Sequence, residues 1–208
     1  MSFPKGPSML HVSERKRLYS FIARLFSYPD AELLAALQDD DAALAARVLG
    51  EPPPDSGKVT VRDLEVAYTD LFINRLGGAP APPYGSVYLE EGGQLMGQTS
   101  LHAGEAYRAE GLSLGGSGEP PDFLSTELEF LYYLVTKEED ALGLKDIAAA
   151  REALRRQADF CRALLHPWIP LFCSKLAEDE EGHPFYRWGG RLLEEFCRLE
   201  NDWLERLT

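Results

Sequence analysis

The stretch from Ala79 to Leu89 reads Ala-Pro-Ala-Pro-Pro-Tyr-Gly-Ser-Val-Tyr-Leu, and the rest of the chain is organised around it. Pro80, Pro82 and Pro83 lack backbone donors and push the residues before them out of the helical conformation. We therefore expect this stretch to be non-helical, with a short extended piece at Ser86 to Leu89. Its large apolar side chains distinguish it from a flexible Gly/Ser linker. Two interpretations stay open, namely a structural crossover between two helical halves and a loop that binds a partner.

On both sides of this stretch, apolar residues recur with the spacing of one helical face. The helix that opens at Thr60, with Asp63 in a capping box, ends in Leu71 and Phe72 and leads directly into the prolines. Four further helices are expected to begin at N-caps, namely at Ser13, at Asp30, at Thr99 or Ser100 for a helix that ends at Gly111, and at Asp122 for a helix that runs to about Thr136. The remaining expected helices run from Asp41 to Leu49, lie between Leu144 and Leu165, start at Pro167, and follow Pro184. No alternating strand pattern of useful length occurs, so the sequence predicts an all-α fold, an irregular multi-helix bundle.

The composition narrows the classes of partner. The 208 residues are enough for a single domain, 1–208, with a full core. The net charge of −13 argues against a nucleic-acid partner and is compatible with a basic peptide. No apolar run is long enough to cross a bilayer, and Met1 to Val12 lacks the apolar centre of a secretory signal, so we expect a cytoplasmic protein without an integral membrane segment.

The three cysteines are scattered among apolar residues, which favours reduced core thiols: Cys161, Cys173 and Cys197.

A second loop, from Gly111 to Pro121, is rich in glycine and ends in two prolines. Its composition indicates backbone freedom, and we expect a hinge at 111–121 between two helical halves.

A glycine-rich segment from Gly92 to Thr99 resembles a phosphate-binding loop, but Gln98 stands where such a loop has its lysine. Turn glycines before a capped helix explain the segment better, although a nucleotide-dependent switch stays open as an alternative. The four histidines share no ligand spacing with cysteines or carboxylates, so we expect no metal site and no cofactor.

A carboxylate falls on the apolar face of the helix that follows Asp122. At about 100° per residue, Glu127 lies among Leu124, Leu131 and Leu134. A buried carboxylate needs a hydrogen-bond donor or must take up a proton. The donor could be internal, in which case the role of Glu127 is structural, or it could come from a ligand, in which case Glu127 lies at the floor of a groove whose wall is the proline stretch.

Two sequence motifs together resemble those of a known protein family. The first is Tyr68-x-x-Leu71-Phe72 followed by Pro82-Pro83-Tyr84-Gly85-Ser86-Val87-Tyr88, and the second is Glu119-Pro120-Pro121-Asp122-Phe123 followed by Glu127-Leu128-Glu129-Phe130. In this order and spacing they resemble the TorD/DmsD/NarJ family of redox-enzyme maturation chaperones, and the likeness extends over nearly the whole chain. The sequence departs from the family pattern at Phe123, where the family commonly has histidine, so no role can rest on a titrating imidazole there.

The resemblance implies a TorD-like, all-α chaperone without catalytic turnover. It implies binding of the N-terminal region, often a twin-arginine signal peptide, of a molybdopterin oxidoreductase of the DMSO-reductase type until its cofactor is inserted. We expect a monomer or a homodimer, and a permanent scaffold subunit of a redox complex stays open as another alternative. The predicted peptide-binding residues are Tyr68, Leu71, Phe72, Tyr84, Ser86, Tyr88, Asp122 and Glu127.

Overall fold

A computed structural model describes residues 10–54, 59–115 and 118–207. Within these residues the protein is built from helices, turns and loops, and the only β-type pairing in the described part is an isolated bridge between Tyr84 and Phe123. The expectation of an all-α, irregular multi-helix bundle is therefore confirmed. Residues 1–9, part of the N-terminal stretch without the apolar centre of a secretory signal, lie outside the described residues, as do residues 55–58 and 116–117 of two expected loops.

Within the described ranges the helices follow one another without an intervening strand. In chain order they are α1 (Val12–Leu25), α2 (Ala31–Ala36), α3 (Asp40–Leu49), α4 (Val61–Tyr68), the π-helical turn η1 (Thr69–Ile73), α5 (Gly85–Leu89), the 3-10 turn η2 (Glu91–Gly93), α6 (Gln98–Ala109), α7 (Leu124–Gly143), α8 (Ile147–Phe160), the π-helical turn η3 (Cys161–Leu165), α9 (Ile169–Glu178) and α10 (Pro184–Leu207).

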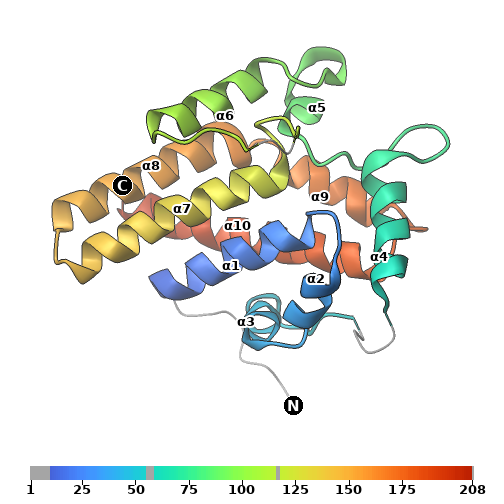
Figure 1. Cartoon of the computed structure of the whole chain (residues 1–208), viewed down its shortest axis with the longest axis horizontal. Coiled ribbons are helices and arrows are strands. Elements are labelled where there is room, and N and C mark those ends of the chain that lie inside the picture. Colours follow the sequence, from blue (N-terminus) through green and yellow to red (C-terminus); the bar gives the residue numbers. More distant parts are fainter. Residues whose placement is uncertain (1–9, 55–58, 116–117, 208) are drawn as a thin grey trace.

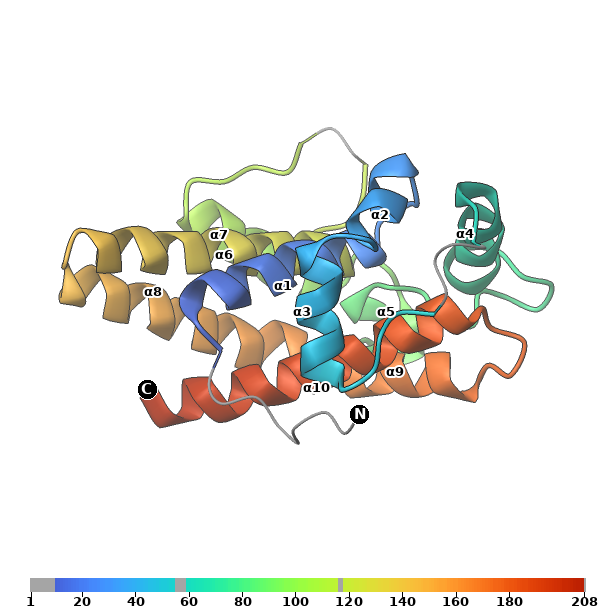
Figure 2. The same cartoon turned by 90° about the horizontal axis from the view of Figure 1, so that it is seen from below.

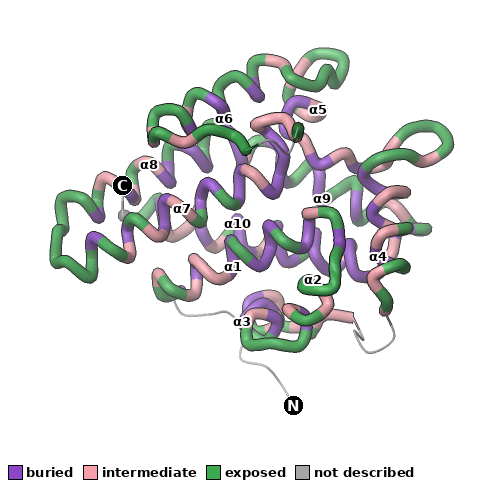
Figure 3. Tube along the Cα trace, viewed as in Figure 1, coloured by how far each residue is buried: buried purple, intermediate pink, exposed green. Residues whose placement is uncertain are grey.

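Long helices form the centre of the molecule (Figure 1). Helix α1 lies along α7, α7 and α8 form an antiparallel hairpin, and α10 packs against α9. The turned view in Figure 2 shows α9 and α10 on the side away from α7, and α4 at one end of the molecule. Buried residues line the facing sides of these helices, whereas exposed residues gather on their outer sides (Figure 3). One hydrophobic cluster, from Leu10 to Leu204, joins them all.

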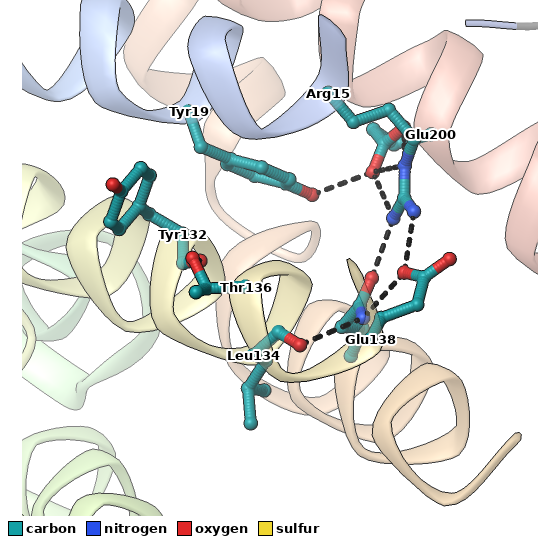
Figure 4. A network of polar contacts seen from close by, with 8 residues as sticks. Arg15, Tyr19, Tyr132, Leu134, Thr136, Glu138 and Glu200 are labelled. Atoms are coloured by element: carbon teal, nitrogen blue, oxygen red, sulfur yellow. Dashed lines mark hydrogen bonds and ion pairs between the residues drawn. The ribbon is translucent and has the colours of Figure 1, made fainter. Parts of the chain in front are cut away.

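A buried polar network crosses this core (Figure 4). The guanidinium of Arg15 on α1 is fully buried and donates to Glu200 on α10, to Glu138 on α7 and to Gln157 on α8, at distances of 2.5 to 3.0 Å. Tyr19 donates to the same Glu200 carboxylate at 2.9 Å. A buried charge is tolerated when its donors are satisfied in this way, so the network fixes four helices against one another.

Several expected helix ends are confirmed. The Thr60–Asp63 capping box opens α4, with the Asp63 carboxylate accepting from the Thr60 amide at 2.9 Å. Asp30 caps α2 by accepting from the Leu33 amide at 2.8 Å. Helix α3 ends at Gly50, whose φ of +79° is the left-handed conformation that glycine adopts without strain. All three cysteines are free and buried.

Three predicted N-caps are wrong, and in two of these helices another side chain accepts from the backbone amides at the helix start. Helix α1 is capped at His11, where the Glu14 carboxylate accepts from the His11 amide at 2.9 Å, so Ser13 lies inside the helix. Helix α6 begins at Gln98, one residue before the expected caps, because the Glu90 carboxylate binds the Thr99 amide. The third, Asp122, is treated with the candidate site below.

The long helices also differ in their ends. Helix α7 continues past the expected end at Thr136 to Gly143, and inside it the Thr136 hydroxyl donates to the Tyr132 carbonyl one turn earlier. Asp146 caps α8, and α8 together with η3 runs from Ile147 to Leu165, within the expected bounds. The next helix begins at Ile169 with Pro170 in its first turn, later than the expected Pro167.

The second half of the proline stretch has a different conformation from the one that we expected. Residues 85–89 form the short helix α5 and not the extended piece that we expected. The three prolines restrict the chain only as far as Pro83, and from Tyr84 onward every residue has a backbone donor again. The Tyr84 backbone is extended and serves as the N-cap, so the change of conformation falls at this residue.

Candidate functional site

The two motifs singled out in the sequence meet through their backbones. The Tyr84–Phe123 bridge is flanked by two hydrogen bonds, from the Leu124 amide to the Pro83 carbonyl at 2.9 Å and from the Gly85 amide to the Asp122 carbonyl at 3.0 Å. The rings of Tyr84 and Phe123 also lie against each other, with centroids 5.4 Å apart. The segment between the prolines and α5 is thereby held on the segment that leads into α7.

Asp122 is fully buried and ties α5 and α6 to this junction. One carboxylate oxygen accepts from the Ser86 amide in the first turn of α5 at 2.6 Å, and the other accepts from the Ser100 hydroxyl on α6. The N-cap of α7 is Phe123, which has no side chain that can cap, so our assignment of Asp122 as the cap of α7 is wrong. The carboxylate is oriented by the amide of α5, a partner 36 residues away in the chain.

Glu127 is fully buried on α7, as the helical pattern predicts. Its Oε2 accepts from the indole Nε1 of Trp168 at 3.2 Å, so at least one donor is internal. Burial is the main cause that raises the pKa of the Glu127 carboxyl well above its usual value, and the negative charge of Asp122 adds to the increase. The hydrogen bond from Trp168 lowers this pKa, but by less than the other two effects raise it. The carboxyl therefore holds a proton at higher pH than an exposed glutamate does.

Three buried side-chain oxygens have no hydrogen-bond partner among the residues that the structure describes. They are Ser86 Oγ, Tyr88 Oη and Glu127 Oε1, and all three belong to the predicted peptide-binding set. Two of the three residues contact Trp168, because Glu127 accepts from its indole and the Tyr88 ring stacks on it with centroids 5.6 Å apart. Ser86 follows Gly85, whose backbone lies close to Nε1 and Cδ1 of the same indole. Burying a polar group without a partner is costly, so this cluster, which we call the polar junction, has hydrogen-bonding capacity to spare.

The remaining three predicted residues belong to an aromatic part of the core. Tyr68 and Phe72 are buried with ring centroids 4.8 Å apart, and the Tyr68 hydroxyl donates to the Phe26 carbonyl at 3.2 Å. Leu71 is buried as well, and its carbonyl accepts from the Ala81 amide at 3.0 Å. Phe172 joins the two groups, because its ring contacts both Phe72 and Tyr88. The two sets of predicted residues thus meet at Phe172, and all eight side chains are buried except those of Tyr84 and Tyr88, which are partly exposed.

Open grooves, which the sequence does not reveal, lie elsewhere on the surface. One of about 530 Å³ separates α4 and η1 from the turn at 179–184, and Leu71 of the first motif lines it. Another of about 540 Å³ lies between α6 and α8, and a third of about 610 Å³ lies between α9 and α10, away from both motifs. These grooves depend on which helices pack beside each other, and the apolar periodicity of a sequence does not determine which helices are neighbours.

The segment that resembles a phosphate-binding loop is already occupied by a carboxylate of the chain. Glu90 accepts from the Thr99 amide at 2.7 Å and from its hydroxyl at 2.8 Å. These hydrogen bonds, together with that from the Gln98 amide, lower the pKa of Glu90. A phosphate would meet a negative charge at this position, so the geometry gives no support to a nucleotide site.

Within the described residues, no group of three or more His, Cys, Asp or Glu is arranged to hold a metal ion. In the same part of the chain, no helix combines the length and apolar character that a bilayer span needs.

The sequence of this chain matches a family model and resembles known proteins. Residues 30–174, which include both motifs, match the family model described as nitrate reductase delta subunit. Chaperone protein TorD of Vibrio vulnificus (strain YJ016) is 31% identical over 144 residues, which are 68% of this chain and 64% of that protein, so the match spans less than two thirds of the relative. The Tat proofreading chaperone DmsD of Salmonella typhi is 28% identical over 174 residues, 80% of this chain and 76% of that one.

Similarity also extends to a solved structure. A crystal structure of an Archaeoglobus fulgidus protein assigned to redox enzyme maturation superposes with a TM-score of 0.55 at 27% sequence identity. The superposition covers 97% of this chain and 99% of that chain, so the two share their architecture from end to end.

Proposed function

This chain belongs to the nitrate reductase delta subunit family, and on that premise we propose that it is a cytoplasmic chaperone, without catalytic turnover, for the maturation of a redox enzyme. The observation that carries the proposal is the family match over residues 30–174, because it includes both motifs that build the polar junction. The TorD and DmsD relatives support the chaperone role, and DmsD is named for proofreading in the Tat pathway.

The client that we propose is the catalytic subunit of a molybdopterin oxidoreductase of the DMSO-reductase type. The chaperone binds its N-terminal twin-arginine region, assists insertion of the cofactor and then releases the subunit for export or assembly. The net charge of −13 supports a basic partner, because opposite charges accelerate encounter and favour the correct complex.

We assign the eight predicted residues to the binding region, with the polar junction as its floor. Ser86 and Glu127 are buried and Tyr88 Oη is enclosed, so direct contact with a peptide requires α5 to shift away from Trp168. The spare hydrogen-bonding capacity of Ser86, Tyr88 and Glu127 supports this assignment, because peptide amides or a guanidinium would supply the missing partners.

The proposal is tested by co-expressing the chain with a candidate molybdoenzyme subunit that carries its own signal region. With the chaperone present, the purified subunit should contain more molybdenum by elemental analysis than without it, and the two proteins should co-purify before the cofactor is inserted. A molybdenum content that does not depend on the chain would contradict the proposed function. Recovery of a stable complex that persists after cofactor insertion would instead indicate a permanent scaffold subunit.

A further inference from the structure

An open groove of about 530 Å³ runs between the outer side of α4 with η1 and the turn that joins α9 to α10. One wall carries Val66, Ala67 and Leu71, and the other is formed by the turn residues Gly182, His183 and Pro184. We call it the α4 groove. Figure 1 shows α4 at the end of the molecule, beside the end of α9 and the start of α10.

Apolar side chains are unusually exposed at this end of the molecule. Val66 in the groove is 62% exposed, Ile73 at the end of η1 is 57% exposed, and Leu76 in the following loop is fully exposed. Single exposed apolar residues are ordinary, but one in the groove and two more within the next ten positions of the chain favour a surface that a partner covers.

The groove is acidic as well as apolar. Its lining includes the carboxylates of Asp63, Asp70 and Glu181 and the guanidinium of Arg62, and Arg75 pairs with Asp70 beside it. Glu180 and Glu181 on the turn are exposed, and neither forms an ion pair with a described residue. Such a surface repels phosphate and attracts a cationic segment.

A second guanidinium, that of Arg75, lies beside the groove and is paired within the chain. Arg75 donates from Nη1 and Nη2 to the two carboxylate oxygens of Asp179, each at 2.8 Å, and also from Nε to Asp70 at 2.7 Å. Two carboxylates around one guanidinium leave a net negative charge, and a paired, planar arrangement of this kind is the geometry by which carboxylates recognise arginine.

We infer that the α4 groove binds an arginine-bearing, partly apolar segment of the client. Arginine guanidinium groups of the client pair with the exposed carboxylates of Glu180 and Glu181, and an apolar side chain next to them packs on Val66. The inference rests on the proposed function and deepens it, because it assigns the first contact with the client to an open surface, at the edge of the first motif.

The probe is a synthetic peptide with two adjacent arginines before a leucine-rich segment, and its match carries two glutamines in their place. Binding to the full chain is measured by calorimetry for wild type, for Val66→Asp and for the double variant Glu180→Lys/Glu181→Lys. Matched controls elsewhere on the surface are Ile147→Asp, a similarly exposed apolar residue at 54%, and Glu91→Lys on η2. All of these positions are exposed, so the variants should fold, and melting curves verify this.

We expect each groove variant to weaken binding of the arginine peptide by about tenfold or more. The affinity of the control variants should stay within about twofold of wild type. The affinity of the wild-type chain for this peptide should fall as salt is added. Equal binding by wild type and the groove variants would overturn the α4 groove and leave the proposed function intact. Equal binding of the arginine and glutamine peptides would overturn the guanidinium contact. A wild-type chain that binds neither the arginine peptide nor a co-expressed client would overturn both proposals together.

Discussion

The indole N–H of Trp168 donates to the Glu127 carboxyl at 3.2 Å, and both side chains are completely buried. This hydrogen bond joins the first half of α7 to the residue that caps α9. The same indole stacks on Tyr88, so Trp168 contacts both sequence motifs at once. Glu127 therefore has the internal donor that its burial requires, and its other oxygen is left available.

Glu127→Gln should reveal the raised pKa as a difference in pH dependence. In wild type the folded state retains a proton that the unfolded chain loses above its ordinary pKa of 4.5, so the free energy of unfolding falls as pH rises from that value toward the folded-state pKa. Glutamine cannot ionise and still accepts from Trp168. Melting curves from about pH 5 to pH 8 should therefore show the variant gaining stability relative to wild type as pH rises.

Parallel melting curves for the two proteins would show that Glu127 is ionised in the folded state as readily as in the unfolded one, contrary to this expectation.

The same variant tests whether Glu127 contacts a ligand. If Glu127 also contacts the client, Glu127→Gln weakens peptide binding at a pH where the two proteins are equally stable. Unchanged peptide affinity would leave Glu127 with a structural role only.

Asp122→Asn should destabilise the fold by about 1.5–3 kcal/mol, the range for hydrogen bonds to charged groups, because it weakens the bonds to the Ser86 amide and the Ser100 hydroxyl. Denaturant unfolding measures the loss. Ser100→Ala removes one of these partners alone, and the double variant should lose less than the sum of the two single changes, because the residues share one hydrogen bond. Strict additivity would mean that the Asp122–Ser100 contact contributes no stability.

Gly85→Ala should destabilise the protein by about 1–3 kcal/mol, the usual cost of overpacking. A methyl group at this position would lie 3.0 Å from Trp168 Nε1 and 3.2 Å from Thr99 Cγ2, so it would press on the indole that binds Glu127. The matched control is Gly143→Ala at the end of α7, where a methyl group meets nothing within 4 Å and alanine favours the helix. Equal denaturation midpoints for the two variants would contradict close packing of α5 on Trp168.

Local signals in the sequence were enough for most of the fold. The capping box at Thr60 and Asp63 and the stop at Gly50 depend on neighbours within a few residues, and both are confirmed. The burial of Glu127 followed from its angle on a helix that contains no other buried charge before Glu138. Both motifs were also found from the sequence, and the structure brings them together at the Tyr84–Phe123 bridge.

The features that the sequence did not predict depend on distant partners. Helix α5 has a first turn whose Ser86 amide binds Asp122, 36 residues further along the chain. The donor to Glu127 is 41 residues away, and nothing near Trp168 in the sequence indicates it. Interactions of this kind depend on which helices become neighbours, and helical periodicity does not determine that.

Limited proteolysis tests the expected hinge at 111–121, which we retain as a proposal together with the single domain 1–208. Leu114 is 41% exposed in this loop, and the segment contains no lysine or arginine, so thermolysin is a better probe than trypsin. We expect the first cleavage within 111–121, identified by mass spectrometry of early fragments, because local opening is cheapest where few apolar contacts are made. First cleavage inside α8 or η3 would argue against this division of the chain.

Arg15→Met should be among the most damaging single changes in the protein. The side chain is fully buried, and its removal leaves the carboxylates of Glu138 and Glu200 in the core without their cation. Breaking a buried ion pair in this way costs about 3–5 kcal/mol, because the remaining charge is neither solvated nor paired. Arg155 on α8 supplies the control: it is exposed and pairs with Glu152 and Asp159, so Arg155→Met should cost at most about 1 kcal/mol. Urea unfolding of both variants measures the contrast. Similar losses would show that the four-helix network in Figure 4 is no more important than a surface ion pair.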